Sequence, residues 1–174
     1  ARAVYDAILA SRTRTFDPEK VATGTGTVGD PWNATQAQTL VAPGDIVAIM
    51  PGVFTGVDPG GNYHYTPGFY PKVSGTNGNP IIYIAENPAV YETVGLSEFR
   101  SGGTVQGSGW PAFGCRNTTD IHYMGVYSDN NVADNKAASD SGTSTFRLGS
   151  DRGYLAFCEL IGNAGQSDNY SAAR

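Results

Sequence analysis

The sequence predicts an all-β solenoid, in which short parallel strands stack along one axis, and three observations lead to it. The 174 residues include 23 Gly and 10 Pro but only 16% charged residues, a composition rich in turn formers and poor in helix formers. Each apolar segment is short and ends at Gly, Asn or Pro. Strand centres at Val47, Ile82, Tyr123 and Phe157 recur at intervals of 35, 41 and 34 residues without hairpin signals. Such repeats bury their apolar faces against one another.

A β-sandwich is the alternative architecture. It would place strands about every 8 to 12 residues with hairpin turns between them. Two further short strands, centred at Phe113 and Phe146, instead repeat after 33 residues, and this favours the solenoid. We expect one domain, with an N-terminal helix and cap at residues 1–20 and stacked strands at 21–174. Because Ser171–Arg174 has the pattern of another short strand, we expect the repeats to continue beyond residue 174.

Two short helices are also expected. Val4, Ile8 and Leu9 have helical spacing within residues 3–12, and a helix at the end of the stack would cover its open edge. Asn33 followed by Gln36 is a capping-box pattern, which predicts a helix of about two turns before Pro43. The remaining expected elements are strands at 46–50, 53–55, 81–85, 112–115, 121–127, 145–148 and 154–161, and loops at 57–79, 96–111 and 128–142.

Glycine-rich turns separate these elements. Residues 24–29 match G-x-G-x-x-G, but a dinucleotide site needs a solid strand before this motif and a long helix after it, and the sequence has neither. A tight turn is therefore the prediction. The pattern G-T-x-G-[DN]-P occurs twice, at 26–31 and at 75–80. In the Pro43-Gly44-Asp45 turn, we expect Asp45 to accept hydrogen bonds from turn amides.

Residues 24–56 combine this Gly-Thr-Val-Gly-Asp-Pro turn, a short helix, Val41-Ala-Pro-Gly-Asp, a strand and Pro51-Gly-Val-Phe-Thr-Gly. They resemble the opening coil of right-handed parallel β-helix proteins of the pectate-lyase-like superfamily. Residues 75–85 resemble that family's second coil, and residues 115–127 and 154–165 resemble later coils. The resemblance covers roughly residues 20–174, and it implies a right-handed parallel β-helix of which this chain forms the N-terminal part.

The resemblance implies two classes of function. One is a non-catalytic, carbohydrate-recognising module of an extracellular or virion surface protein, of the tail-spike, fibre or adhesin type. The other is a polysaccharide lyase or glycoside hydrolase with its active site largely beyond residue 174, and no residue here matches a catalytic motif of the family. Because no acid–base constellation stands out, we favour recognition. The expected partners are a polysaccharide or cell-surface glycan and, in a surface assembly, two further copies forming a homotrimer.

Aromatic residues are the best candidates for carbohydrate binding, because rings cover the apolar faces of sugars while Tyr hydroxyls meet sugar hydroxyls. Four of them lie in the long loop at 57–79 and one lies in the loop at 96–111. The alternative is that these rings pack the loops onto the rest of the chain. The candidates are Tyr63, Tyr65, Phe69, Tyr70 and Trp110.

Other polar residues have ordinary structural explanations. His64 lies in the aromatic loop, and His122 alternates with apolar neighbours, which places it on an outward face. Oxygen-rich residues near Asp129, Asp134 and Asp140 could bind calcium but lack the order of a calcium loop, so we predict no cofactor, with calcium as the exception. An arginine and a carboxylate on one face would serve a lyase, but surface ion pairs are the simpler explanation and the one we favour. The residues concerned are Arg147, Arg152 and Arg174 with Asp151 and Glu159.

Composition excludes several partners. The formal net charge of −5 argues against nucleic acid, which requires a basic surface. No apolar run approaches the length of a membrane span, and no signal peptide is recognisable. Cys115 and Cys158 are either two free thiols that act as small apolar residues or, in a secreted chain, a disulfide; we favour free thiols.

Overall fold

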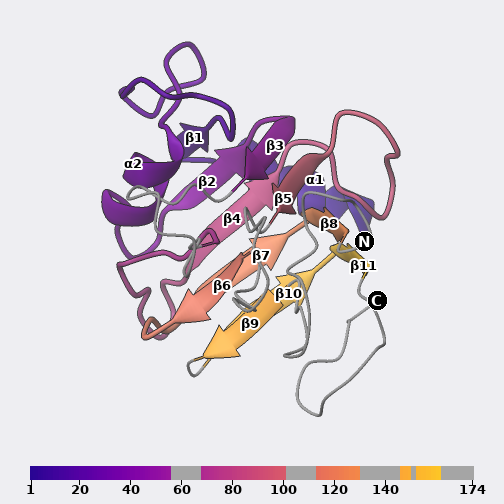
Figure 1. Cartoon of the computed structure of the whole chain (residues 1–174). Helices are drawn as coiled ribbons and strands as arrows, with labels where there is room; N and C mark the ends of the chain where they lie inside the picture. The colour runs from indigo at the N-terminus through magenta and orange to yellow at the C-terminus, as the bar shows by residue number, and fades with distance from the viewer. Residues whose placement is uncertain (56–67, 101–112, 130–145, 150–151, 162–174) are drawn as a thin grey trace, which may run out of the picture.

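The computed structural model describes residues 1–55, 68–100, 113–129, 146–149 and 152–161, which contain two helices and eleven strands (Figure 1). The helices are α1 (Arg2–Ala10) and α2 (Ala34–Thr39). The strands are β1 (Arg14–Phe16), β2 (Ile46–Ile49), β3 (Gly52–Thr55), β4 (Ile81–Ala85), β5 (Ser97–Arg100), β6 (Phe113–Arg116), β7 (Ile121–Met124), β8 (Tyr127–Asp129), β9 (Phe146–Gly149), β10 (Tyr154–Ala156) and β11 (Glu159–Ile161).

The strands form three parallel sheets. A five-stranded sheet has the order β1-β2-β4-β7-β10, a four-stranded sheet has the order β11-β8-β5-β3, and β6 pairs with β9. The middle strands of the five-stranded sheet lie side by side in Figure 1. Their register aligns Val47, Tyr83, Tyr123 and Leu155 in one row. The strands predicted around Val47, Ile82 and Tyr123 therefore pair as direct neighbours.

The predicted fold class, an all-β right-handed parallel β-helix with a capping helix, is wrong. The chain begins with helices and strands in alternation, α1-β1-α2-β2, and both helices bury side chains completely, at Tyr5 and Ala37. With separate parallel sheets of five and four strands, the arrangement is α/β-like. Parallel neighbours always need long crossover connections. Intervals of 34 to 41 residues therefore indicate parallel pairing without specifying a solenoid.

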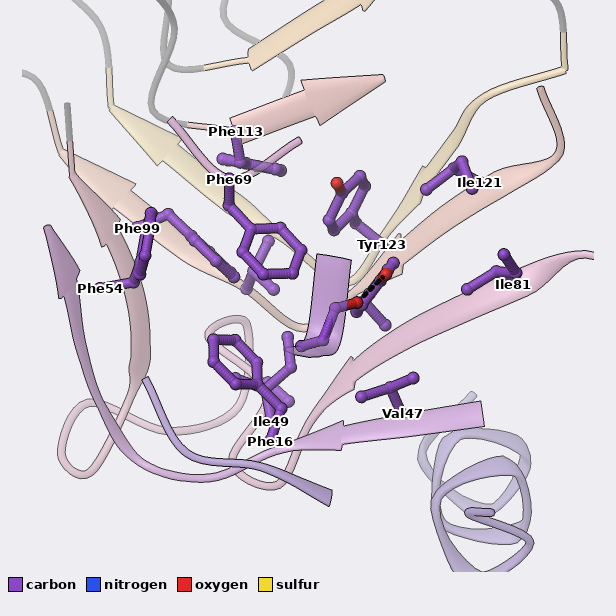
Figure 2. Packing of buried hydrophobic residues seen from close by; sticks show 14 of the residues in the cluster. Phe16, Val47, Ile49, Phe54, Phe69, Ile81, Phe99, Phe113, Ile121 and Tyr123 are labelled. Carbon is purple, nitrogen blue, oxygen red and sulfur yellow. Dashed lines mark hydrogen bonds between the residues drawn. The ribbon is translucent and has the colours of Figure 1, made fainter. Parts of the chain in front are cut away.

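The main hydrophobic core lies between the sheets and is centred on Phe69 (Figure 2). The Phe69 ring is fully buried and stacks on Phe16 at a centroid distance of 5.2 Å. It meets Tyr83 edge-on at 5.1 Å and lies 5.2 Å from Phe99. Helix α2 closes this core, because the buried Tyr83 hydroxyl donates a 2.6 Å hydrogen bond to the Ala37 carbonyl. Residues from both larger sheets and from α2 therefore share one apolar cluster.

Helix α1 packs on the opposite face of the five-stranded sheet, and Figure 2 shows it on the far side of β2 from the core. Tyr5 is its fully buried residue and packs with Ile84 and Met124. The Tyr5 hydroxyl donates a hydrogen bond to the Ala85 carbonyl. Gly125 makes room for this ring, because it has φ +72° and a Cβ there would collide with the Tyr5 hydroxyl.

The helix predicted to cover the open sheet edge therefore covers a sheet face instead. The free edge of β1 is occupied by residues 26–32. The Thr15 amide donates to the Gly26 carbonyl at 2.8 Å, and the Trp32 amide donates to the Thr15 carbonyl at 2.9 Å. An edge covered in this way cannot pair with another strand.

The predictions for both helices are confirmed, and most of the predicted strands are present. The single strands predicted at 121–127 and 154–161 are wrong, because each is divided into two strands of different sheets, β7 and β8, and β10 and β11. The predicted centre Phe157 lies between β10 and β11, and the loop predicted at 128–142 is wrong at its start, which belongs to β8.

The capping box is present: Asn33 accepts from the Gln36 amide, and the Gln36 side chain accepts from the Asn33 amide. β1 was not predicted, and the predicted loop at 96–111 is wrong at its start, because β5 pairs with β3 and β8. Ser-Glu-Phe-Arg was not recognised as a strand because its inward residues, Ser97 and Phe99, are only two.

The repeated hexapeptide forms the same kind of turn twice. Thr27 and Asp30 exchange backbone hydrogen bonds of 3.2 Å, and Thr76 and Asn79 exchange bonds of 3.1 and 2.9 Å. The Asp45 prediction is also confirmed, since its carboxylate accepts from the Ala42 amide at 2.8 Å and from the Thr13 hydroxyl at 2.8 Å. These glycine-rich turns are structural.

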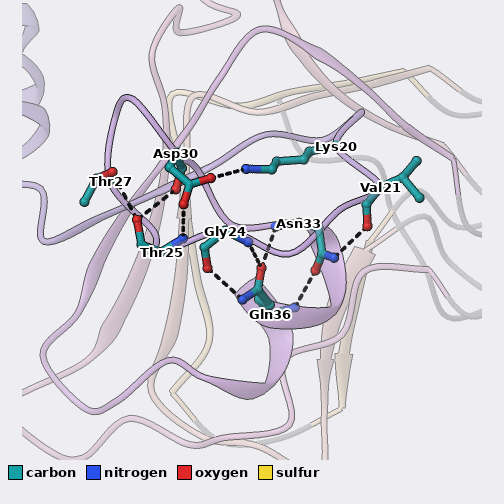
Figure 3. A network of polar contacts seen from close by, with 8 residues as sticks. All are labelled: Lys20, Val21, Gly24, Thr25, Thr27, Asp30, Asn33 and Gln36. Carbon is teal, nitrogen blue, oxygen red and sulfur yellow. Dashed lines mark hydrogen bonds and ion pairs between the residues drawn. The ribbon is translucent and has the colours of Figure 1, made fainter.

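The G-x-G-x-x-G segment is likewise held by internal polar contacts (Figure 3). Asp30 accepts from Lys20 at 2.6 Å and from the Thr25 amide at 2.8 Å. Gln36 bonds both backbone groups of Gly24, at 2.7 and 2.8 Å. The Gly26 and Thr27 amides also donate to the Asp30 carbonyl, at 2.9 and 3.2 Å. A six-residue helix follows the motif, and the segment forms the tight turn that was predicted.

Candidate functional site

The candidate site lies on the outer face of the five-stranded sheet, beside α1. Register aligns Ile46 on β2 with Ile82 on β4, Ile82 with His122 on β7, and His122 with Tyr154 on β10. This row faces away from the main core, because the residues that follow each of them in sequence point inward. Ile46 and Ile82 pack in the cluster under α1. The row therefore begins at β2 with apolar side chains packed under α1, and it ends at β10 with an aromatic side chain exposed to solvent.

The open end of the row is a pair of rings. Tyr154 is 58% exposed although it belongs to a paired strand. His122 is half-buried between Ile82 and Tyr154, and its ring centroid lies 5.6 Å from that of Tyr154 at an interplanar angle of 57°. An exposed aromatic ring beside an imidazole offers an apolar surface with polar groups at its border.

A carboxylate–guanidinium pair lies beside the rings. Asp120 and Arg152 stand two residues before His122 and Tyr154, respectively. The Arg152 Nε and Nη2 atoms donate to the two Asp120 carboxylate oxygens at 2.6 and 2.7 Å. The Asp120 side chain is 6% exposed and that of Arg152 is 56% exposed. Because the paired bonds fix the guanidinium plane, Arg152 presents an anchored cationic group to solvent.

The site's ionisable groups have shifted pKa values. The hydrogen bonds from Arg152 hold the pKa of Asp120 below its usual value, against the opposing effect of desolvation. Burial lowers the pKa of His122, and the nearby Asp120 charge opposes that shift. At neutral pH His122 is therefore a neutral imidazole, which donates from one ring nitrogen and accepts at the other.

The backbone at the start of β7 and β10 has an unusual conformation. Asp120 has φ 56° and Arg152 has φ 60°, both in the left-handed region. Aspartate tolerates this region, but it costs an arginine on the order of 1–3 kcal/mol. Strain of this kind is concentrated at functional sites, so the backbone of Arg152 supports a functional role for this end of the row.

Two of the five predicted aromatic binding residues, Phe69 and Tyr70, do not form this site. Phe69 is 0% exposed and Tyr70 is 3% exposed. Both are core residues whose ring faces meet protein rather than solvent, as the packing alternative expected. Tyr63, Tyr65 and Trp110 lie outside the described residues.

The other predicted candidates do not all lie at this site. His122 lies on the outward face, as predicted, whereas His64 lies outside the described residues. Glu159 is exposed on β11, in the four-stranded sheet and away from Arg152. Cys115 and Cys158 are both free thiols, as favoured. The remaining candidates, Asp134, Asp140, Asp151, Arg174 and the side chains of Asp129 and Arg147, lie outside the described part of the structure.

Two searches of the described residues concern metals and membranes. No group of three or more His, Cys, Asp or Glu side chains in the described ranges could hold a metal ion. Neither α1 nor α2 is long and apolar enough to cross a membrane.

Sequence reasoning did not identify Tyr154 as a site residue. It opens the segment Tyr154-Leu155-Ala156, which predicts a strand. The sequence signal that could have identified it is alternation along the strand. Leu155 points inward, so its neighbour Tyr154 points outward. Only the pairing of β10 with β7 shows that Tyr154 adjoins His122, 32 residues earlier in the chain.

Comparison with known proteins gives no further constraint, since no family model, no curated protein and no solved structure matches this chain.

Proposed function

We propose that this protein recognises carbohydrate at the outer sheet face formed by His122, Tyr154 and Arg152. The observation that carries the proposal is the exposed Tyr154 ring beside a half-buried imidazole on a rigid sheet. A sugar ring places its C–H face on such a side chain. The expected partner is a polysaccharide or cell-surface glycan, met outside the cell or on a virion surface.

Polar groups next to Tyr154 can form hydrogen bonds with the hydroxyl groups of a stacked sugar. Neutral His122 donates or accepts a hydrogen bond at the edge of the stacked ring. Arg152, held by Asp120, donates to hydroxyl or carboxylate oxygens without having to be ordered first. A preorganised site loses less conformational entropy on binding.

The experiment is a glycan array followed by titration calorimetry with the best ligand. Tyr154→Ala should lower the affinity about fivefold or more, because losing a stacked aromatic contact costs on the order of 1 kcal/mol or more. Tyr154→Phe should retain most of the affinity, since the ring remains. Tyr91→Ala, at an exposed Tyr that contacts Arg2 and Phe157 instead, is the matched control. Equal affinity of Tyr154→Ala and the parent chain would contradict the proposal.

Polysaccharide cleavage is the second candidate, favoured by a neutral imidazole close to an anchored guanidinium. In an eliminating lyase, Arg152 would bind a sugar carboxylate and His122 would take the proton α to it. A C=C bond then forms as the glycosidic C–O bond β to the carboxylate breaks, and the leaving sugar oxygen takes a proton from solvent. Incubating the chain with uronic-acid polymers and following the ultraviolet absorbance of unsaturated products distinguishes the two. Binding without product supports recognition, and product that disappears in His122→Ala supports cleavage.

A further inference from the structure

We infer that Asn77 is a site of spontaneous deamidation in the folded protein. Asn77-Gly78 is the only Asn-Gly pair in the sequence. It occupies the two central positions of the second G-T-x-G-[DN]-P turn. The first copy of that turn carries Val28 at the position of Asn77. The two copies therefore have the same backbone pairing, but only the second contains an Asn-Gly pair.

The turn leaves the reacting groups accessible. Asn77 and Gly78 are exposed. The bonds that hold the turn use the backbone groups of Thr76 and Asn79. Within the described part of the chain, no hydrogen bond is found for the Gly78 amide or the Asn77 carboxamide. A Cβ at Gly78 would meet nothing within 4 Å, so the space beside the Gly78 Cα is open.

The reaction needs only water. The Gly78 amide nitrogen gives up its proton to solvent and attacks Cγ of Asn77. The new N–Cγ bond closes a succinimide ring while the Cγ–Nδ2 bond breaks and ammonia leaves. Water then adds to one of the two ring carbonyls and breaks a ring C–N bond, yielding aspartate or isoaspartate. Nothing is oxidised or reduced, and the chain gains one negative charge.

Neighbouring asparagines lack this combination. The residue after Asn79 and after Asn87 is proline, whose nitrogen carries no proton to release. Asn33 has its carboxamide engaged, accepting from the Gln36 amide at 3.0 Å and donating to the Val21 carbonyl at 2.9 Å. Asn117 is exposed, but the β-branched Thr118 follows it and crowds the approach. The selectivity for Asn77 follows from these differences.

Isoaspartate at this position would alter the fold locally. It adds a methylene group to the backbone inside the Thr76–Asn79 turn. The Asn79 carbonyl also accepts from the Gly44 amide at 3.1 Å, so a change in this turn reaches the Pro43-Gly44-Asp45 turn that precedes β2. We therefore expect the modified chain to be less stable than the parent.

The test is incubation of the folded chain in mildly alkaline buffer, followed by peptide mapping and enzymatic isoaspartate labelling. The expected result is an acidic species with isoaspartate at residue 77 and unmodified Asn33, Asn87 and Asn117. Asn77→Val, which restores the residue of the first copy, should remove the acidic species while keeping the fold. Conversion in urea but not in the folded chain would overturn the inference, as would equal conversion at Asn117.

Discussion

Phe69 connects the parts of the core at the scale of one residue. Its ring touches aromatic side chains from β1, β3, β4 and β5. Phe69→Ala should destabilise the protein by about 3–5 kcal/mol, because it removes buried apolar area and leaves a cavity between the sheets. Urea denaturation followed by circular dichroism measures this loss. Tyr154→Ala is the exposed control and should change the stability by about 0.5 kcal/mol or less.

The Asp120 carboxylate makes the stability of the folded protein depend on pH in the acidic range. Its folded-state pKa is lowered mainly by the Arg152 hydrogen bonds, so its stabilisation is present above the unfolded pKa of about 3.9 and is lost as pH falls through the folded value. The parent chain should exceed Asp120→Asn in denaturation midpoint near neutral pH, and the difference should shrink below about pH 4. A difference that stays constant with pH would show that the carboxylate charge has no part in it.

The capping box is the clearest prediction at the scale of elements. Helix α2 has only six residues, so its first turn depends on the contacts of Asn33 and Gln36. Asn33→Ala should cost about 1 kcal/mol, since it leaves the Gln36 amide without its side-chain acceptor. Thr35→Ala, at an exposed position within the same turn of helix, is the matched control for the cap. Thermal denaturation of the two variants measures the difference.

For the whole molecule, the five-stranded sheet joins two apolar clusters, the main core on one face and the α1 cluster on the other. Deleting residues 1–10 should expose Ile84 and Met124 and increase binding of an apolar dye. Because both clusters share β4 and β7, the deletion should also lower the unfolding midpoint reported by Trp32 in the main core.

A Trp110→Phe background makes Trp32 the single tryptophan of this experiment. Val4→Ala, at an exposed position on α1, is the control for a change confined to the helix surface. An unchanged Trp32 midpoint after the deletion would mean that the two clusters unfold independently.

Local features could be read from the sequence because neighbouring residues cause them. Asn33 and Gln36 are three positions apart, and their capping box forms as predicted. The hexapeptide turns depend on glycines and on bonds within four residues, and both copies have the same pairing. Ile81–Ala85 is bounded by Pro80 and Asn87-Pro88, and it forms β4.

The site could not be read in the same way, because its members lie far apart in the chain. Asp120 and Arg152 are 32 residues apart, as are His122 and Tyr154, and only the pairing of β7 with β10 brings them together. For the aromatic residues near Gly and Pro, the sequence also did not show whether the side chains face solvent or the protein interior. In the structure, Phe69 and Tyr70 point into the protein.

The sequence by itself determined most of the short strands, both helices, the turns and the parallel pairing around Val47, Ile82 and Tyr123, because hydrophobic pattern and turn chemistry act locally. Only the tertiary structure decided the α/β-like class, the place of α1 on a sheet face and the surface on which His122 meets Tyr154. Those features depend on which faces pack against each other. Packing between segments that are far apart in the chain cannot be recognised from the residues next to each segment.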